Sequence, residues 1–168
     1  MPKGAQRFLD ALEQDVRQSY RVEVRRTDHG LTIPASGYSG FDAALRVVEG
    51  GCWVALDGWV EELESLAAGR DILLAALSGE ARLAIDTIAG RPRQWTLQLL
   101  DTRGDWVSQS STGRVTWRLW GKPGVIYRRN LNRHRETGLI QSLPDIETVA
   151  CDTANEPWPM RTVPAFSV

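Results

Sequence analysis

Short stretches of alternating apolar and polar residues dominate this chain of 168 residues, and most are separated by only a few turn-forming residues. Alternation with a period of two is typical of a strand that has one buried and one solvated face. Connections this short cannot carry a parallel crossover, which needs a dozen or more residues. The spacing therefore predicts antiparallel sheet as the framework of the fold.

The expected strands share this alternation and are bounded by Gly, Pro, Asp or Ser. They are residues 20–26, 31–35, 41–47, 52–56, 81–86, 95–99, 106–109, 114–120 and 125–129. The hairpin formed by residues 81–86 and 95–99 has the clearest pattern of all of them.

Two stretches have helical periodicity instead, residues 5–19 and residues 57–78. Both place apolar side chains at steps of three and four, which makes one apolar face. We expect the second helix to begin at an N-cap provided by Asp57 and to be distorted at Gly69, because glycine costs about 1 kcal/mol relative to alanine inside a helix. Two short helices that meet at Gly69 are the alternative.

The predicted fold is α+β: a mostly antiparallel sheet of about eight strands in the order α-ββββ-α-ββββ. The N-terminal helix and the central helix (residues 57–78) are expected to pack on one face of this sheet. Residues 1–130 are predicted to form a single domain. Residues 131–168 lose periodicity and contain four prolines, so we expect an irregular C-terminal tail that is packed on the surface or partly disordered.

The longest apolar run, residues 72–77, is far shorter than the roughly 20 residues of a membrane-spanning helix, and the N-terminus lacks the apolar core of a signal peptide. We therefore expect a cytoplasmic protein without membrane contact. Cys52 and Cys151 form no CxxC pair, so we expect two free thiols. With only two histidines and no ligand spacing, the sequence predicts no metal and no cofactor.

The net charge of −1 conceals an uneven distribution. Residues 1–90 carry nine basic and fourteen acidic residues, for a net charge of −5. Residues 91–135 carry ten and two, for +8, and residues 136–168 carry one and five, for −4. The middle part either faces an anionic partner or is neutralised by the acidic parts of the same chain.

The strongest candidate site is the sequence RRNLNRHR at residues 128–135, which follows strands rich in Trp and Arg. Arginine pairs with carboxylate or phosphate through a planar fork of donors, and an outward Trp can take part in a partner interface. The candidate binding residues are Arg118, Trp120, Arg128, Arg129, Arg133, His134 and Arg135. A solvated strand end that the acidic tail balances is the alternative interpretation.

The seven tryptophans are the second signal. Alternation or helical spacing assigns five of them to packing, namely Trp53, Trp59, Trp95, Trp106 and Trp117. Trp120 is the one we expect to face outward from its strand.

Three functions are compatible with these patterns. The leading hypothesis is a non-catalytic binding or adaptor protein that uses a basic, Trp-containing sheet surface to bind an acidic protein partner. The first alternative is a nucleic-acid-binding protein that uses the same basic strip. The second alternative is a small enzyme of unrecognised type, although the sequence contains no catalytic motif that we can identify. The oligomeric state is not predicted.

Overall fold

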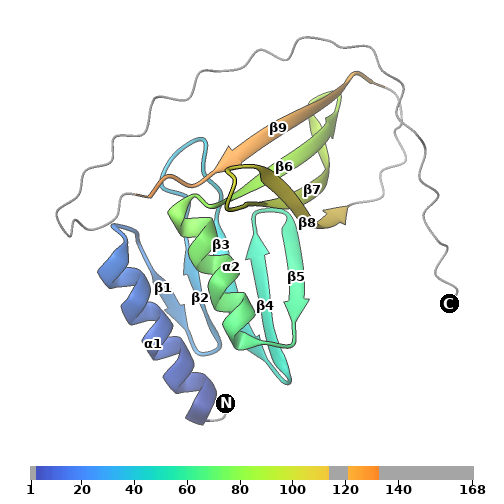
Figure 1. The fold of residues 1–168 in the computed structure, drawn as a ribbon. Helices are drawn as coiled ribbons and strands as arrows, with labels where there is room; N and C mark the ends of the chain where they lie inside the picture. Colours follow the sequence, from blue (N-terminus) through green and yellow to red (C-terminus); the bar gives the residue numbers. More distant parts are fainter. Residues whose placement is uncertain (1–2, 114–120, 133–168) are drawn as a thin grey trace, which may run out of the picture. The chain divides into compact units, whose positions relative to one another are not determined.

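A computed structural model describes residues 3–113 and 121–132 of the chain (Figure 1). The elements of this part are α1 (Lys3–Ser19), β1 (Arg25–Thr27), β2 (Gly30–Ile33), β3 (Ala43–Val48), β4 (Gly51–Leu56), β5 (Trp59–Leu63), α2 (Leu66–Ser78), β6 (Ala81–Ile88), β7 (Arg91–Leu100), β8 (Trp106–Gly113) and β9 (Pro123–Arg129). The predicted α+β class with antiparallel strands is confirmed. Neither described helix is long and apolar enough to cross a membrane.

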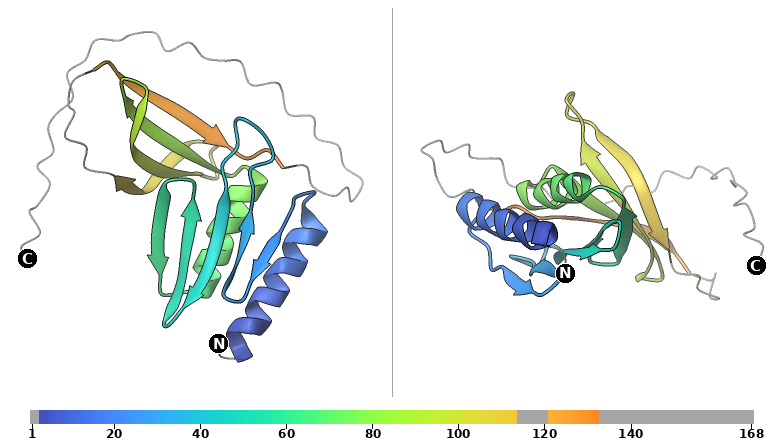
Figure 2. Two further views of the ribbon diagram at one scale, coloured as in Figure 1. Left: turned by 180° about the vertical axis from the view of Figure 1, so that it is seen from behind. Right: turned by 90° about the horizontal axis from the view of Figure 1, so that it is seen from below.

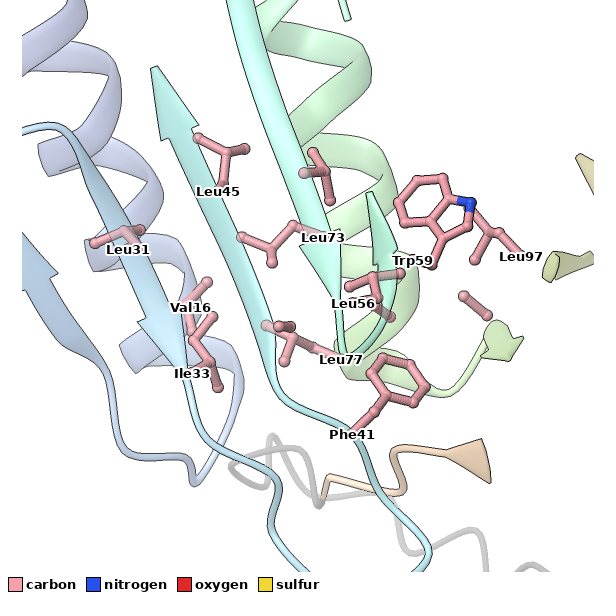
Figure 3. Close-up of a cluster of buried hydrophobic side chains, with 14 of the residues drawn as sticks. Val16, Leu31, Ile33, Phe41, Leu45, Leu56, Trp59, Leu73, Leu77 and Leu97 are labelled. Atoms are coloured by element: carbon pink, nitrogen blue, oxygen red, sulfur yellow. The ribbon is translucent and has the colours of Figure 1, made fainter. Parts of the chain in front are cut away.

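The first five strands form one antiparallel sheet in the order β1-β2-β3-β4-β5. Both helices cover the same face of this sheet, α1 beside β2 and α2 over β3 and β4 (Figure 2). The core lies between these two layers, where Leu45, Leu56, Leu73 and Trp59 belong to one cluster of buried side chains (Figure 3). Each of these four side chains is at most 1% exposed.

The central helix is shorter than the sequence suggests. The prediction of one helix over residues 57–78 is wrong, because α2 begins only at Leu66 and the preceding residues form strand β5. Ser65, not Asp57, is the N-cap, and its hydroxyl accepts a hydrogen bond from the Ala68 amide at 3.3 Å. The order of elements is therefore α-βββββ-α-ββββ within the described residues.

A two-residue turn, Asp57-Gly58, connects β4 to β5. Asp57 adopts a positive φ of 54°, a conformation that Asp and Asn tolerate better than most residues. Gly58 lies against the ring of Trp95, and a Cβ built there would come within 2.2 Å of it. The turn therefore requires a residue without a side chain at position 58.

Helix α2 continues across Gly69 without interruption, from Leu66 to Ser78, so the alternative of two short helices that meet at Gly69 is wrong. Gly69 packs closely on the sheet, where a Cβ built on it would be 2.3 Å from the Cys52 Sγ atom. The helix ends at Gly79, whose φ of 83° is the left-handed conformation common at helix C-termini.

The other four strands form a second antiparallel sheet in the order β8-β7-β6-β9. The predicted hairpin of β6 and β7 is confirmed, and its turn uses positive φ angles at Ala89 and Gly90. Strand β9 returns to pair with β6 on the side opposite to β7, with Arg82 facing Arg129 across the pair. This places β9 and β8 at the two edges of the sheet.

Side chains of β8 join the second sheet to the free edge of β5. The Thr112 hydroxyl accepts a hydrogen bond from the Val60 amide at 3.2 Å and donates one to the Val60 carbonyl at 2.9 Å. The Ser110 hydroxyl accepts a bond from the Trp59 indole nitrogen at 3.1 Å and donates one to Glu61. The Thr112 hydroxyl thus makes the two main-chain bonds that a sixth strand would make at Val60.

Several further predictions have mixed outcomes. The strand expected at residues 20–26 is mostly absent, because β1 covers only Arg25–Thr27. Of the tryptophans expected to pack, Trp59 and Trp95 are buried, whereas Trp53 is 44% exposed on the face that no helix covers. The strand predicted at residues 114–120 and Cys151 lie outside the described residues, as does most of the predicted tail. Cys52 is a buried free thiol, and burial raises its pKa.

Replacing Gly69 by Ala should destabilise the protein by about 1–3 kcal/mol, because the added methyl group overlaps the Cys52 Sγ atom in a packed core. Helix propensity alone predicts the opposite, a gain of up to about 1 kcal/mol. Urea denaturation measures the difference in the free energy of unfolding. Gly4→Ala is the matched control, since Gly4 lies in α1 with no atom within 4 Å of an added Cβ, and it should be neutral or stabilising. Equal behaviour of the two variants would contradict the prediction.

Candidate functional site

Arg128 and Arg129, the two predicted site residues that the structure describes, project from opposite faces of β9. Arg128 forms an ion pair with Asp57, with 3.0 Å between the Nη1 and Oδ2 atoms. Arg129 instead donates from Nε to the Gly79 carbonyl, at 2.5 Å, and its guanidinium faces the Trp106 ring. The other predicted site residues lie outside the described residues; they are Arg118, Trp120, Arg133, His134 and Arg135.

Arg129 belongs to a group of four stacked side chains. The guanidinium carbon of Arg82 lies 4.4 Å from the ring centroid of Trp106 and 4.4 Å from that of Tyr127. The guanidinium carbon of Arg129 lies 5.2 Å from the Trp106 centroid. These distances are within the range of cation–π attraction. We call Arg82, Trp106, Tyr127 and Arg129 the aromatic–arginine cluster.

Strand register explains why these four side chains meet. Arg82 of β6 is opposite Arg129 of β9, and Tyr127 follows two residues away on the same face. On the other side, Arg82 is opposite Gln98 of β7, and Trp106 of β8 pairs with Leu100, two residues beyond Gln98. The cluster thus uses three strands of the second sheet. We call this side of the sheet its open face, since the buried Leu83 and Leu97 project from the other side.

Each arginine of the cluster is fixed through Nε alone. The Arg82 Nε atom donates to Gln98 Oε1 at 2.8 Å, and the Arg129 Nε atom donates to Gly79. A guanidinium has five N–H donors, so four remain on the terminal nitrogens of each residue. Within the described part of the chain these terminal nitrogens have no hydrogen-bond partner.

The charge of the cluster is not compensated by a nearby carboxylate. No Asp or Glu among the described residues lies within 4.0 Å of the guanidinium nitrogens of Arg82 or Arg129. The pKa of Arg82 is lowered, first by burial and then by the positive charge of Arg129, while Tyr127 acts in the other direction. Two like charges side by side favour an anionic partner.

Uncharged polar groups surround the cluster on the open face. Gln98 donates to the Ser108 hydroxyl at 3.2 Å, and the hydroxyls of Thr96 and Ser111 are 2.8 Å apart. Asp86 is the acidic residue of β6 on this face, and burial raises the pKa of its carboxyl while Arg93 opposes that shift. The face can therefore offer hydrogen bonds as well as charge.

A cavity of about 920 Å³ lies elsewhere, between the N-terminal residues of α1, the β3–β4 turn and the start of α2. Its lining is mainly apolar but includes four ionisable residues, His29, Arg46, Glu49 and Glu64. Among the described residues no three His, Cys, Asp or Glu side chains are grouped closely enough to hold a metal. The cavity shares no residue with the aromatic–arginine cluster.

Sequence reasoning missed Arg82, Trp106 and Tyr127. Alternation does place Arg82 on the side of its strand opposite to Leu83, so its outward direction could have been predicted. The pairing of β9 with β6, which brings Tyr127 and Arg129 to Arg82, joins residues more than 40 positions apart and has no local signal. Trp106 was assigned to packing, and it does pack, but against an arginine on the open face.

Comparisons with known proteins gave no match to a family model, a curated protein or a solved structure.

The asparagines of the RRNLNRHR segment serve the fold. The Phe41 amide donates to Asn130 Oδ1 at 2.9 Å, and Asn130 Nδ2 donates to the Phe41 carbonyl at 3.1 Å. Asn130 is only 2% exposed. Asn132 Nδ2 donates to the Leu77 carbonyl at 3.2 Å, and its Oδ1 accepts from the Ser36 hydroxyl at 2.6 Å. These bonds attach the residues after β9 to the loop between β2 and β3 and to α2.

Replacing Asn130 by Ala should lower the free energy of unfolding by about 2–4 kcal/mol, because it leaves two buried main-chain groups of Phe41 without partners. Asn132→Ala should cost about 1 kcal/mol, since its bonds lie nearer the surface. Urea denaturation of both variants checks the difference. Equal costs would contradict the structural role given to Asn130.

Proposed function

We propose that this chain is a non-catalytic cytoplasmic binding protein that recognises an acidic protein partner through the open face of its second sheet. The aromatic–arginine cluster supports this proposal more than any other feature. Two arginines lie side by side, held by aromatic rings and by single bonds from Nε, and no carboxylate of the described residues pairs with them. The planar donors of such guanidinium groups match the two oxygens of a carboxylate, which can accept two parallel hydrogen bonds.

The stacking also bears on the nucleic-acid alternative. Proteins that bind single-stranded nucleic acid without sequence preference stack bases on exposed aromatic faces. Arg82 covers one face of Trp106 and one face of Tyr127, so these faces are not open to a base. Carboxylates that approach the terminal guanidinium nitrogens need no open ring face, which favours an acidic protein.

The proposal predicts a specific pattern of binding to a fluorescent Glu-rich peptide measured by anisotropy at low salt. Arg82→Gln and Arg129→Gln should each weaken binding about tenfold or more, because each removes charge-assisted hydrogen bonds. Arg128→Gln is the matched control, since Arg128 is adjacent to Arg129 but is paired with Asp57 on the opposite face. Its affinity should stay near that of the unchanged protein.

Three results would contradict the proposal. One is the absence of binding to the Glu-rich peptide at low salt. Another is equal affinity for a peptide with Lys in place of Glu. The third is tighter binding of single-stranded RNA or DNA of similar length, which would favour the nucleic-acid alternative. Circular dichroism of each variant verifies that the fold is retained.

A further inference from the structure

The outer edge of β9 carries main-chain groups that no described residue uses. The Arg129 amide donates to the Ser39 carbonyl at 2.9 Å, so the main chain of Arg129 faces away from β6. The Lys122 carbonyl accepts a hydrogen bond from the Ala89 amide, so the main chain of Lys122 faces the β6 side. Alternate residues of a strand direct their main-chain groups to the same side. The amides and carbonyls of Val125 and Tyr127 therefore face away from β6, and no other described residue bonds to them.

The side chains along this edge are apolar and half exposed. Val125 is 46% exposed, Ile126 47% and Tyr127 55%. Edge strands of natural proteins are usually protected by a charged side chain, a proline or a bulge. Pro123 lies only at the first position of β9, and the pairing with β6 has no irregularity that would twist the edge away. Residues 124–127 themselves carry no charged side chain, and no strand of the described residues pairs with their outer edge.

We propose that the acidic partner binds as an extended segment that adds a strand to the outer edge of β9, beside Val125 and Tyr127. This inference rests on the proposed function and specifies the form of the partner. Strand addition supplies main-chain hydrogen bonds, and alternate side chains of the added strand supply specificity. Side chains of the added strand that point to the open face lie next to Tyr127 and Arg129. Their carboxylates accept hydrogen bonds from the terminal guanidinium nitrogens of the aromatic–arginine cluster.

Charge selects an acidic segment over a second copy of the chain. Residues 121–132 contain three basic residues, Lys122, Arg128 and Arg129, and no acidic residue. Two copies of β9 placed edge to edge would bring like charges together, which is unfavourable between neighbouring strands. A segment that alternates Glu with apolar residues places its charges on the open face, beside Arg129 and away from Arg128, which is paired with Asp57.

The test uses the full chain and a fluorescent peptide of about ten residues, a typical upper length for a strand, in which Glu alternates with Val. Val125→Pro removes an amide that β6 does not use, and prolines are tolerated on edge strands for this reason. This variant should bind about tenfold more weakly or worse, because the added strand loses a hydrogen bond and its close approach. Val125→Ala, which retains the amide, should bind within about threefold of the unchanged protein.

Amide hydrogen exchange gives a second readout that requires no variant. Binding of the peptide should slow exchange at Val125 and Tyr127, whereas the Ile126 amide, which faces β6, should change little. Unchanged exchange at Val125 and Tyr127 with peptide bound would overturn strand addition.

The outcomes separate the two proposals. If Val125→Pro binds normally while Arg129→Gln does not, the edge is not used and the proposed function stands. If the unchanged protein does not bind the peptide at all, the proposed function fails. If protection of Val125 and Tyr127 instead depends on protein concentration and accompanies a dimer in sedimentation, the occupant is a second copy and this inference is wrong.

Discussion

The main-chain groups at the edges of a sheet must find partners, and this requirement organises the described part of the protein. An antiparallel sheet of five strands ends at β5 with a row of free amides and carbonyls. No further strand of the described residues pairs with this edge. The Thr112 hydroxyl of β8 instead bonds to both the amide and the carbonyl of Val60. The Ser110 hydroxyl bonds to two side chains of β5, the Trp59 indole and the Glu61 carboxylate. These side-chain bonds join the second sheet to the edge of the first.

The class of the fold was predictable because short turns between alternating segments allow only antiparallel pairing of the strands. The β6–β7 hairpin and the β3–β4 turn at Gly50 appear in the sequence as period-two patterns around glycine. The start of α2 was not predicted, because Trp59 and Leu63 are four residues apart and residues at that spacing share a face in a helix and in a strand. The Asp57-Gly58 pair between apolar segments is a strong hairpin signal, and it would have separated the two cases.

The site was only partly predictable, for two different reasons. Arg128 and Arg129 are consecutive in a strand, so alternation alone requires them to face opposite sides, and grouping them on one surface neglected this rule. The other members of the cluster come together only through the order of the strands in the second sheet. A charge count detects an excess of arginine between residues 91 and 135, but Arg82 lies outside that range in a part with net charge −5. It joins the cluster only because β9 pairs with β6, a contact between distant residues.

The way in which Arg82 is held bears on how strongly such a surface can bind. A free arginine side chain loses conformational entropy when it is fixed on a ligand, and this cost reduces affinity. Arg82 is already fixed between Trp106 and Tyr127 and through its Nε bond to Gln98. Burial is the main cause that lowers the pKa of Arg82, and the effect of Arg129 is smaller than the opposing effect of Tyr127. A carboxylate that reaches Arg82 would therefore meet a guanidinium group that is already ordered, which lowers the entropic cost of binding more than any relief of charge repulsion does.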